Sequence, residues 1–356
     1  MKPIAYDIDP GGDAEIVLKG TINAQAIIPR INRQFPLQGE RRDPTYDGHT
    51  DSHFDNPYCG VFDDDDADPG DETKVEVRMR VSSRHLILAS RTFRVMLGGP
   101  WSENLAFNSQ SGPAQIKASG WDPAAFTVVL DAIHGRYNGI PEAINIGLLC
   151  RIASVVDYYD CHQCLRHTSY VWMENLCKNY KKTTTLCKSS LMWLFVSWVF
   201  SSQDLMNAMS RIILSKTQDI SDISSRDLPL GPILEKIDVT RQELIDRLIT
   251  ALERLRQTLL GETSCPRGNS NCPIMMLGNL MRTNHKLWMF GIPDAPYNGY
   301  SVSGIVAEIA KSSEHFGYYG KSSCSCTIKS RLKTTLDGIE KDISTYRLKW
   351  FLCSRR

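Results

Sequence analysis

The chain has 356 residues, of which 42% are hydrophobic and 23% are charged. These proportions are those of an ordinary globular protein, and the length allows about two domains with a substantial core. The 41 basic and 40 acidic side chains leave a formal net charge of +1. That balance argues against nucleic-acid binding as the main function, because proteins that bind nucleic acid usually carry a basic excess.

The sequence predicts a protein of the nucleus or the cytoplasm. Its first residues, MKPIAYDIDPGGDAE, lack the apolar segment of a secretory signal. The most apolar run, Leu191–Phe200, has ten residues, whereas a helix needs about 20 to cross a bilayer. We therefore expect a buried helix there and no membrane anchor. Eleven cysteines without a secretion signal indicate reduced thiols rather than disulfides.

Two stretches predict the strands of a hairpin near the amino terminus. Asp13–Leu18 has the apolar pattern of a strand, and Lys74–Val81 alternates apolar and polar residues. Between them, Gln38–Glu72 is polar and rich in Asp, Gly and Pro. It cannot bury enough apolar surface to offset the entropy lost on ordering, so we expect a disordered insert. Its acidic run, Asp63–Asp66, lacks the spaced oxygen ligands of a calcium loop, which favours a solvated acidic loop.

Two short helices are predicted directly after the second strand. The first begins at Ser82 or Ser83, whose hydroxyl groups are candidates for capping it. The second covers Arg91–Leu97, and the residues Gly-Gly-Pro that follow end it.

This stretch resembles the signature of the BTB/POZ domain in the form common in filamentous fungi, V-x-S-x-x-L-x-x-A-S-x-x-F-x-x-M-L-x-G-x-W-x-E. The matching residues are Val81, Ser83, Leu86, Ala89, Ser90, Phe93, Met96, Leu97, Gly99, Trp101 and Glu103. The resemblance implies a small sheet flanked by helices, and it covers residues 13–178 apart from the insert at about 38–72.

Further elements follow in chain order. Ala114–Ser119 predicts a third strand, and Asp122–Gly135 a helix that Asp-Pro starts. A further helix is expected over Asn145–Tyr158. The fold class is therefore α+β, with a mostly helical carboxy-terminal region over 185–356. The helices expected in that region are Leu191–Met209, Ile233–Gly261, Met275–Leu287, Ser303–Ser313 and Leu332–Phe351.

No motif for nucleophilic catalysis and no phosphate-binding loop is present, so we expect no catalytic residues. We expect His85, His134 and His162 to lie apart from one another as structural residues. Cys161-x2-Cys164 has the spacing of a zinc knuckle or a redox motif. Because no second pair lies at the usual distance, buried structural thiols are favoured there.

Two other cysteine pairs predict a metal site. Cys265 and Cys272, and Cys324 and Cys326, lie in loops rich in Ser, Gly, Asn and Pro, where burial alone explains cysteine poorly. Four thiolates that converge there would bind a structural zinc ion and join the carboxy-terminal helices. Neither pair has the usual chelate spacing, so unmetallated thiols are the alternative.

By resemblance, the function is protein–protein interaction without catalysis, with a homodimer formed through the first helices and the exposed strand edge. One role of BTB proteins is to bring a substrate to a cullin ubiquitin ligase, and the docking surface would then lie around the Asp122–Gly135 helix and the loop before it. No nucleic-acid or membrane partner is expected. The rival hypothesis is a metal-dependent enzyme that uses the carboxy-terminal cysteines, with His285 or His315 as a further ligand.

Overall fold

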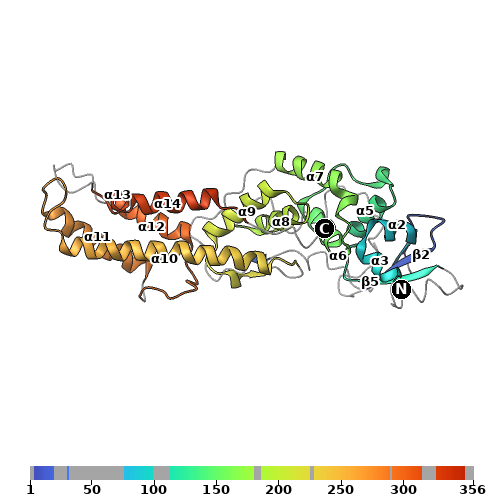
Figure 1. Cartoon of the computed structure of the whole chain (residues 1–356), viewed down its shortest axis with the longest axis horizontal. Helices are drawn as coiled ribbons and strands as arrows, with labels where there is room; N and C mark the ends of the chain where they lie inside the picture. Colours follow the sequence, from blue (N-terminus) through green and yellow to red (C-terminus); the bar gives the residue numbers. More distant parts are fainter. Residues whose placement is uncertain are drawn as a thin grey trace, which may run out of the picture.

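The computed structural model describes residues 4–19, 30–31, 76–98, 113–179, 186–224, 228–288, 291–314 and 326–348. These residues form an elongated molecule, with a small sheet at one end and long helices at the other (Figure 1). This mixed architecture, which is mostly helical, agrees with the predicted α+β class. The predicted insert at 38–72 and the signature residues Gly99, Trp101 and Glu103 lie outside the described residues.

The sheet has four strands in the order β1-β4-β2-β5. The predicted hairpin is confirmed, because β2 and β4 pair antiparallel with Ile16 opposite Met79. The predicted third strand is β5, which pairs parallel with β2. An additional strand, β1, pairs parallel with β4 at the other edge. The bounds are β1 Ile4–Asp7, β2 Ala14–Lys19, β4 Glu76–Val81 and β5 Ala114–Ser119.

A second, two-stranded sheet joins distant parts of the chain. It pairs β3 (Arg30–Ile31) antiparallel with β6 (Ile223–Ser224). Since β6 belongs to the carboxy-terminal half, this short pairing connects the segment that follows β2 to that half.

Helices α2 (Ser83–Ala89) and α3 (Arg91–Gly98) follow β4 as predicted. The start of α2, however, is not capped by a serine of its own. The carboxylate of Asp13, at the start of β2, accepts hydrogen bonds from the backbone N–H and the hydroxyl of Ser83, at 2.8 and 2.7 Å. Burial raises the pKa of Asp13, but these hydrogen bonds outweigh burial and hold the pKa below its usual value. The sheet thus fixes where α2 begins.

Three further helices complete the amino-terminal part, namely α5 Pro123–Ile133, α6 Ile146–Tyr159 and α7 Arg166–Asn179. Asp122 caps α5 by accepting a hydrogen bond from the N–H of Ala125, and Asn145 caps α6 in the same way. Short 3-10 turns lie at Tyr137–Gly139 and His162–Leu165.

Helix α5 is buried along its entire length. Every residue from Pro123 to Ile133 is buried, because the helix packs against both α6 and β4 and its side chains are apolar or small, apart from Asp131, which pairs with Arg136 at 3.5 Å. A buried helix offers no surface to a partner. A partner at the position predicted for a cullin, around Asp122–Gly135, would have to contact exposed residues beside the helix, such as Gly135 and Tyr137, and that docking surface stays a prediction.

Helix α8 (Lys188–Val199) contains the most apolar stretch of the sequence and is the core helix predicted there. It packs against α6 on one side and α9 (Gln203–Lys216) on the other, so buried residues of both halves of the chain form one apolar cluster. The single helix predicted over Leu191–Met209 is wrong, because the chain turns at Ser201 with a φ of 59°. Within the part of the chain that the structure describes, every helix is too short or too polar for a bilayer span.

The remaining helices form a bundle at the other end of the molecule (Figure 1). The longest helix of this bundle is α10, with 31 residues. It confirms the amphipathic helix predicted over Ile233–Gly261. The bounds are α10 Gly231–Gly261, α11 Asn271–Leu287, α12 Val302–Glu314, α13 Ile328–Arg331 and α14 Lys333–Thr345, with a 3-10 turn at Ile220–Asp222.

A buried arginine fixes the loop between α11 and α12 to α10. The side chain of Arg241 is only 1% exposed, and its Nε donates to Asp238 at 2.6 Å. Its guanidinium also donates to four backbone carbonyls, those of Gln218, Pro296, Tyr297 and Tyr300. A buried charge is tolerated because each of the three guanidinium nitrogen atoms has an acceptor.

Candidate functional site

Three of the four cysteines predicted as metal ligands converge at the far end of the bundle. The sulfur atoms of Cys265, Cys272 and Cys326 all lie within 4.8 Å of one another. Cys265 and Cys272 are 6% and 3% exposed, and Cys326 is partly buried. The fourth predicted ligand, Cys324, lies outside the described residues.

Three different segments bring these thiols together. Cys265 lies in the loop after α10, Cys272 is the second residue of α11, and Cys326 precedes α13. The loop closes on itself, because the N–H of Cys265 donates to the carbonyl of Asn269 and the N–H of Gly268 donates to the carbonyl of Cys265, at 3.1 and 2.8 Å. Gly268 has a φ of 79°, a conformation in which glycine avoids the strain of a side chain.

The histidine ligands of the rival enzyme hypothesis do not join this cluster. His285 lies thirteen residues after Cys272 on α11, which places it about 20 Å further along the helix axis. His315 lies outside the described residues. Among the described residues, the group contains no histidine and no carboxylate. A catalytic zinc would need such ligands and an open cleft, so the geometry gives the enzyme hypothesis no support.

The pair Cys161 and Cys164 lies elsewhere, between α6 and α7. Cys161 is buried and Cys164 is partly buried. Burial raises the pKa of both thiols above the ordinary value, which keeps them protonated and poorly reactive at neutral pH. Buried, protonated thiols of this kind fit the structural role that the sequence favours for the pair.

Two histidines predicted to lie apart are in contact. The rings of His85 and His134 have centroids 5.0 Å apart. His134 Nε2 accepts the backbone N–H of Ser82 at 2.9 Å, and Nδ1 faces the carbonyl of Leu130 at 2.8 Å. This arrangement needs the neutral ring, with the proton on Nδ1. No pattern in the sequence indicates this contact, because α2, which carries His85, and the end of α5, which His134 follows, meet only in the folded chain.

Acidification is expected to destabilise the fold through His134. Burial, the largest effect, lowers the pKa of His134, and His85 acts in the same direction. The unfolded chain then binds the proton more readily than the folded chain, so this contribution to stability is complete above about pH 6.5 and is lost as the pH falls below it. Melting curves between about pH 7 and pH 5 would measure the loss.

The His134→Gln variant keeps an acceptor for Ser82 but does not titrate, so its melting temperature should fall less over that pH range. His167→Gln, at an exposed position on α7, serves as the control and should behave like the unmodified protein. An equal fall in all three proteins would contradict this role for His134.

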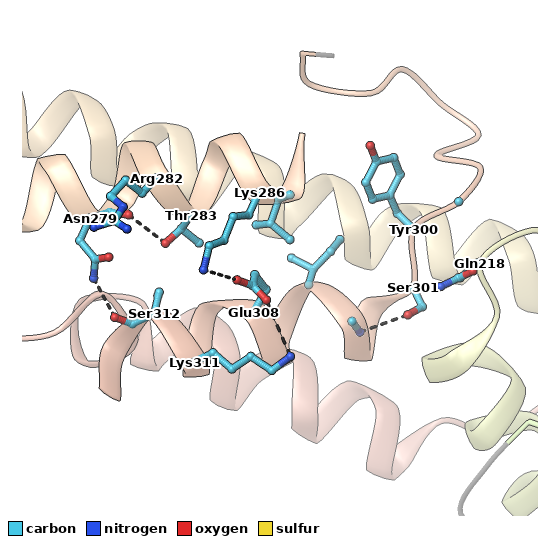
Figure 2. A pocket seen from close by; sticks show the side chains of 14 residues that line it. Gln218, Asn279, Arg282, Thr283, Lys286, Tyr300, Ser301, Glu308, Lys311 and Ser312 are labelled. Carbon is cyan, nitrogen blue, oxygen red and sulfur yellow. Dashed lines mark hydrogen bonds and ion pairs between the residues drawn. The ribbon is translucent and has the colours of Figure 1, made fainter. Parts of the chain in front are cut away.

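A cavity of about 620 Å³ lies between α11 and α12. Figure 2 shows Lys286 of α11 and Lys311 of α12 pointing toward Glu308, at 3.5 and 3.9 Å. With Arg282, three basic side chains and one acidic side chain line it, a net charge of +2. The residues that line it are Gln218, Asn279, Arg282, Thr283, Lys286, Leu287, Gly299, Tyr300, Ser301, Gly304, Ile305, Glu308, Lys311 and Ser312.

Sequence reasoning missed this cavity, although Arg282 and Lys286 gave a signal. Like charges four residues apart on one helix repel each other. In the fold, Glu308 on the other side of the cavity pairs with Lys286 and reduces this repulsion. The polar groups of the wall bond to one another, as in the hydrogen bond from Asn279 to the carbonyl of Ser312 at 2.7 Å. None of the lining residues, all of which are described, has a buried side-chain polar atom without a partner. The wall therefore points to no particular ligand.

Exposed apolar side chains lie on the helices expected to form a dimer. Leu88 of α2 is 79% exposed and Val95 of α3 is 53% exposed. Arg94 Nε donates to the carbonyl of Ile87 at 3.2 Å, which joins the two helices beside these residues. We call Leu88 and Val95 the α2–α3 apolar pair.

Comparison of the chain with protein-family models, with curated proteins and with solved structures found no match. The resemblance to BTB/POZ domains therefore depends on the signature residues quoted above, and both the family and the function drawn from it stay predictions.

Proposed function

We propose that this chain is a non-catalytic protein–protein interaction module of the BTB/POZ type, which forms a homodimer through α2, α3 and a strand edge. The observation that carries the proposal is the α2–α3 apolar pair. Two large apolar side chains exposed on consecutive short helices are best accommodated when a second copy of the chain covers them.

The architecture of the amino-terminal part supports this proposal. A small sheet flanked by helices is what the resemblance implies, and α2 and α3 directly follow β4. The edge strand β5 alternates buried Ile116 with exposed Lys117. An exposed charge of this kind discourages open-ended strand pairing, so the apolar pair is the better candidate for the centre of the contact.

Light scattering on the purified chain tests the dimer. The expected mass is twice the 40.1 kDa of one chain. The double variant Leu88→Glu, Val95→Glu should be a folded monomer, because two carboxylates would be buried without partners in the contact. Val239→Glu, at an exposed apolar position of α10 (58% exposed), should remain dimeric. A monomeric unmodified chain, or a double variant that stays dimeric, would refute the proposal.

The partner class is a separate question, which affinity purification of the tagged chain from its native host addresses. Recovery of a cullin would support the role of substrate adaptor that the resemblance implies. Because α5 is buried, variants for such a contact belong on exposed positions around it, such as Tyr137, which is 59% exposed.

A further inference from the structure

We infer that Cys265, Cys272 and Cys326 bind one zinc ion, which joins the loop between α10 and α11 to the segment before α13. The site is independent of the proposed dimer, since the bundle end that carries it lies at the opposite end of the molecule from α2 and α3 (Figure 1). Its role is structural, because the ligands come from three separate segments of the chain.

The distances suit a thiolate-bound metal. Zinc binds sulfur at about 2.3 Å in a tetrahedron, which places two sulfur ligands about 3.8 Å apart. The three sulfur atoms lie within 4.8 Å of one another, so small side-chain movements bring all three to one ion. A disulfide would require two of them at about 2.05 Å and would leave the third cysteine out.

The local electrostatics favour the thiolate form. Cys272 is the second residue of α11, a helix of 17 residues, so its sulfur lies at the positive end of the helix dipole. The first backbone N–H groups of a helix have no acceptor within the helix, and a negative charge there is stabilised. Zinc then offsets most of the charge of the three thiolates.

Within its loop, Cys265 is the residue that turns inward, where it joins the buried core cluster together with Cys272. From Thr263 to Asn271, Cys265 is the only buried residue, and the others are exposed or partly buried. A loop with so few apolar contacts gains little from burying one small side chain, about 1–2 kcal/mol. A metal bond would hold the loop far more firmly.

An ion pair next to the cluster shows that the same segments are already close. Arg331 of α13 bonds to Glu262, the residue that follows α10. Both side chains are about one-quarter exposed, at 24% and 25%, so this contact alone is weakened by solvent. Zinc at the three thiols would cross-link the same two parts of the chain, the end of α10 and the segment at α13.

The ligand type selects the metal. Soft thiolates favour zinc, copper(I) or iron–sulfur clusters over magnesium and calcium. Zinc is the member of this group that requires no redox partner and serves as a structural cross-link in small loop-rich sites. Cobalt(II) in place of zinc gives a spectroscopic probe, because thiolate coordination produces an intense charge-transfer band that oxygen ligands do not.

The test uses the full chain, purified with a reductant and without added metal. Elemental analysis should find one zinc per chain, and exchange with cobalt(II) should give the thiolate charge-transfer band. Cys326→Ser should bind zinc about 100-fold more weakly or worse, since loss of even an outer partner costs 10–100-fold. Cys177→Ser, at an exposed cysteine of α7, should bind like the unmodified chain.

Circular dichroism shows whether Cys326→Ser is folded. If this variant does not fold, the zinc content and the cobalt(II) band of the unmodified chain still test the inference. Absence of both zinc and the cobalt band from the unmodified chain would overturn the inference. So would full binding by Cys326→Ser, or an intact mass lower by two hydrogens, which reveals a disulfide. The Leu88→Glu, Val95→Glu variant should keep its zinc, so failure of the dimer and failure of the metal site are distinguishable.

Discussion

Replacing Arg241 by alanine is expected to lower the free energy of unfolding by about 3–5 kcal/mol, the range found when one partner of a buried charged network is removed. The truncation leaves Asp238 without its partner at 2.6 Å. It also removes one donor from each of four backbone carbonyls around the loop between α11 and α12, of which those of Gln218 and Tyr297 keep a second, backbone donor. Each buried group that loses its partner bears a desolvation cost of about 1–3 kcal/mol.

Urea unfolding followed by circular dichroism would measure this loss. Arg247→Ala on the same helix is the matched control, because the ion pair of Arg247 with Asp342 is about half exposed and should be worth at most about 1 kcal/mol. Arg241→Lys keeps the charge but not the planar fork, so it should recover only a small part of the loss. Equal effects of the two alanine variants would contradict the organising role of Arg241.

Replacing Phe93 by alanine is expected to cost a similar ~3–5 kcal/mol, since it empties a large site in a packed core. The Phe93 side chain is 1% exposed and stacks on Tyr159 of α6, with ring centroids 4.4 Å apart and planes at 13°. The variant therefore loses both the burial of an aromatic ring and the contact that holds α3 to α6.

The same unfolding measurement applies, with Tyr170→Ala as the control for removal of an aromatic ring. Tyr170 is 62% exposed on α7, so its loss should change stability by no more than about 0.5 kcal/mol. An unchanged unfolding curve for Phe93→Ala would show that α3 does not pack as described.

Residue patterns along the chain predicted most of the regular elements. The hairpin and third strand followed from alternating apolar residues, and α10 from apolar residues at helical spacing. These patterns are local, so they are readable without the fold. The break at Ser201 was missed because apolar residues continue on both sides of it.

Contacts between distant residues could not be predicted in this way. The carboxylate at the start of α2 comes from Asp13, 70 residues earlier. The acceptors of Arg241 are mostly backbone carbonyls, which any sequence supplies and which therefore leave no mark on it. In the sequence of α10, Arg241 cannot be told apart from the exposed charged residues of the same helix.

The candidate metal site was the exception, because cysteines in polar loops are unusual enough to be noticed. Cys265, Cys272 and Cys326 were grouped because cysteines in polar loops are candidate metal ligands, and the fold places their sulfur atoms within 4.8 Å of one another. The cavity between α11 and α12 has a lining of common polar residues, so its position depends on how two helices cross and was not predictable.

The elongated shape affects how this protein behaves in solution. A compact chain of 356 residues has a radius of gyration of about 20 Å, which corresponds to a sphere about 50 Å across. Helix α10 alone, with 31 residues, is about 46 Å long, and the sheet lies beyond its amino-terminal end (Figure 1). Frictional drag on such a body exceeds that on a sphere of equal mass. A single chain will therefore leave a gel-filtration column earlier than a compact standard of 40.1 kDa and imitate a larger species, so elution volume alone overstates its mass.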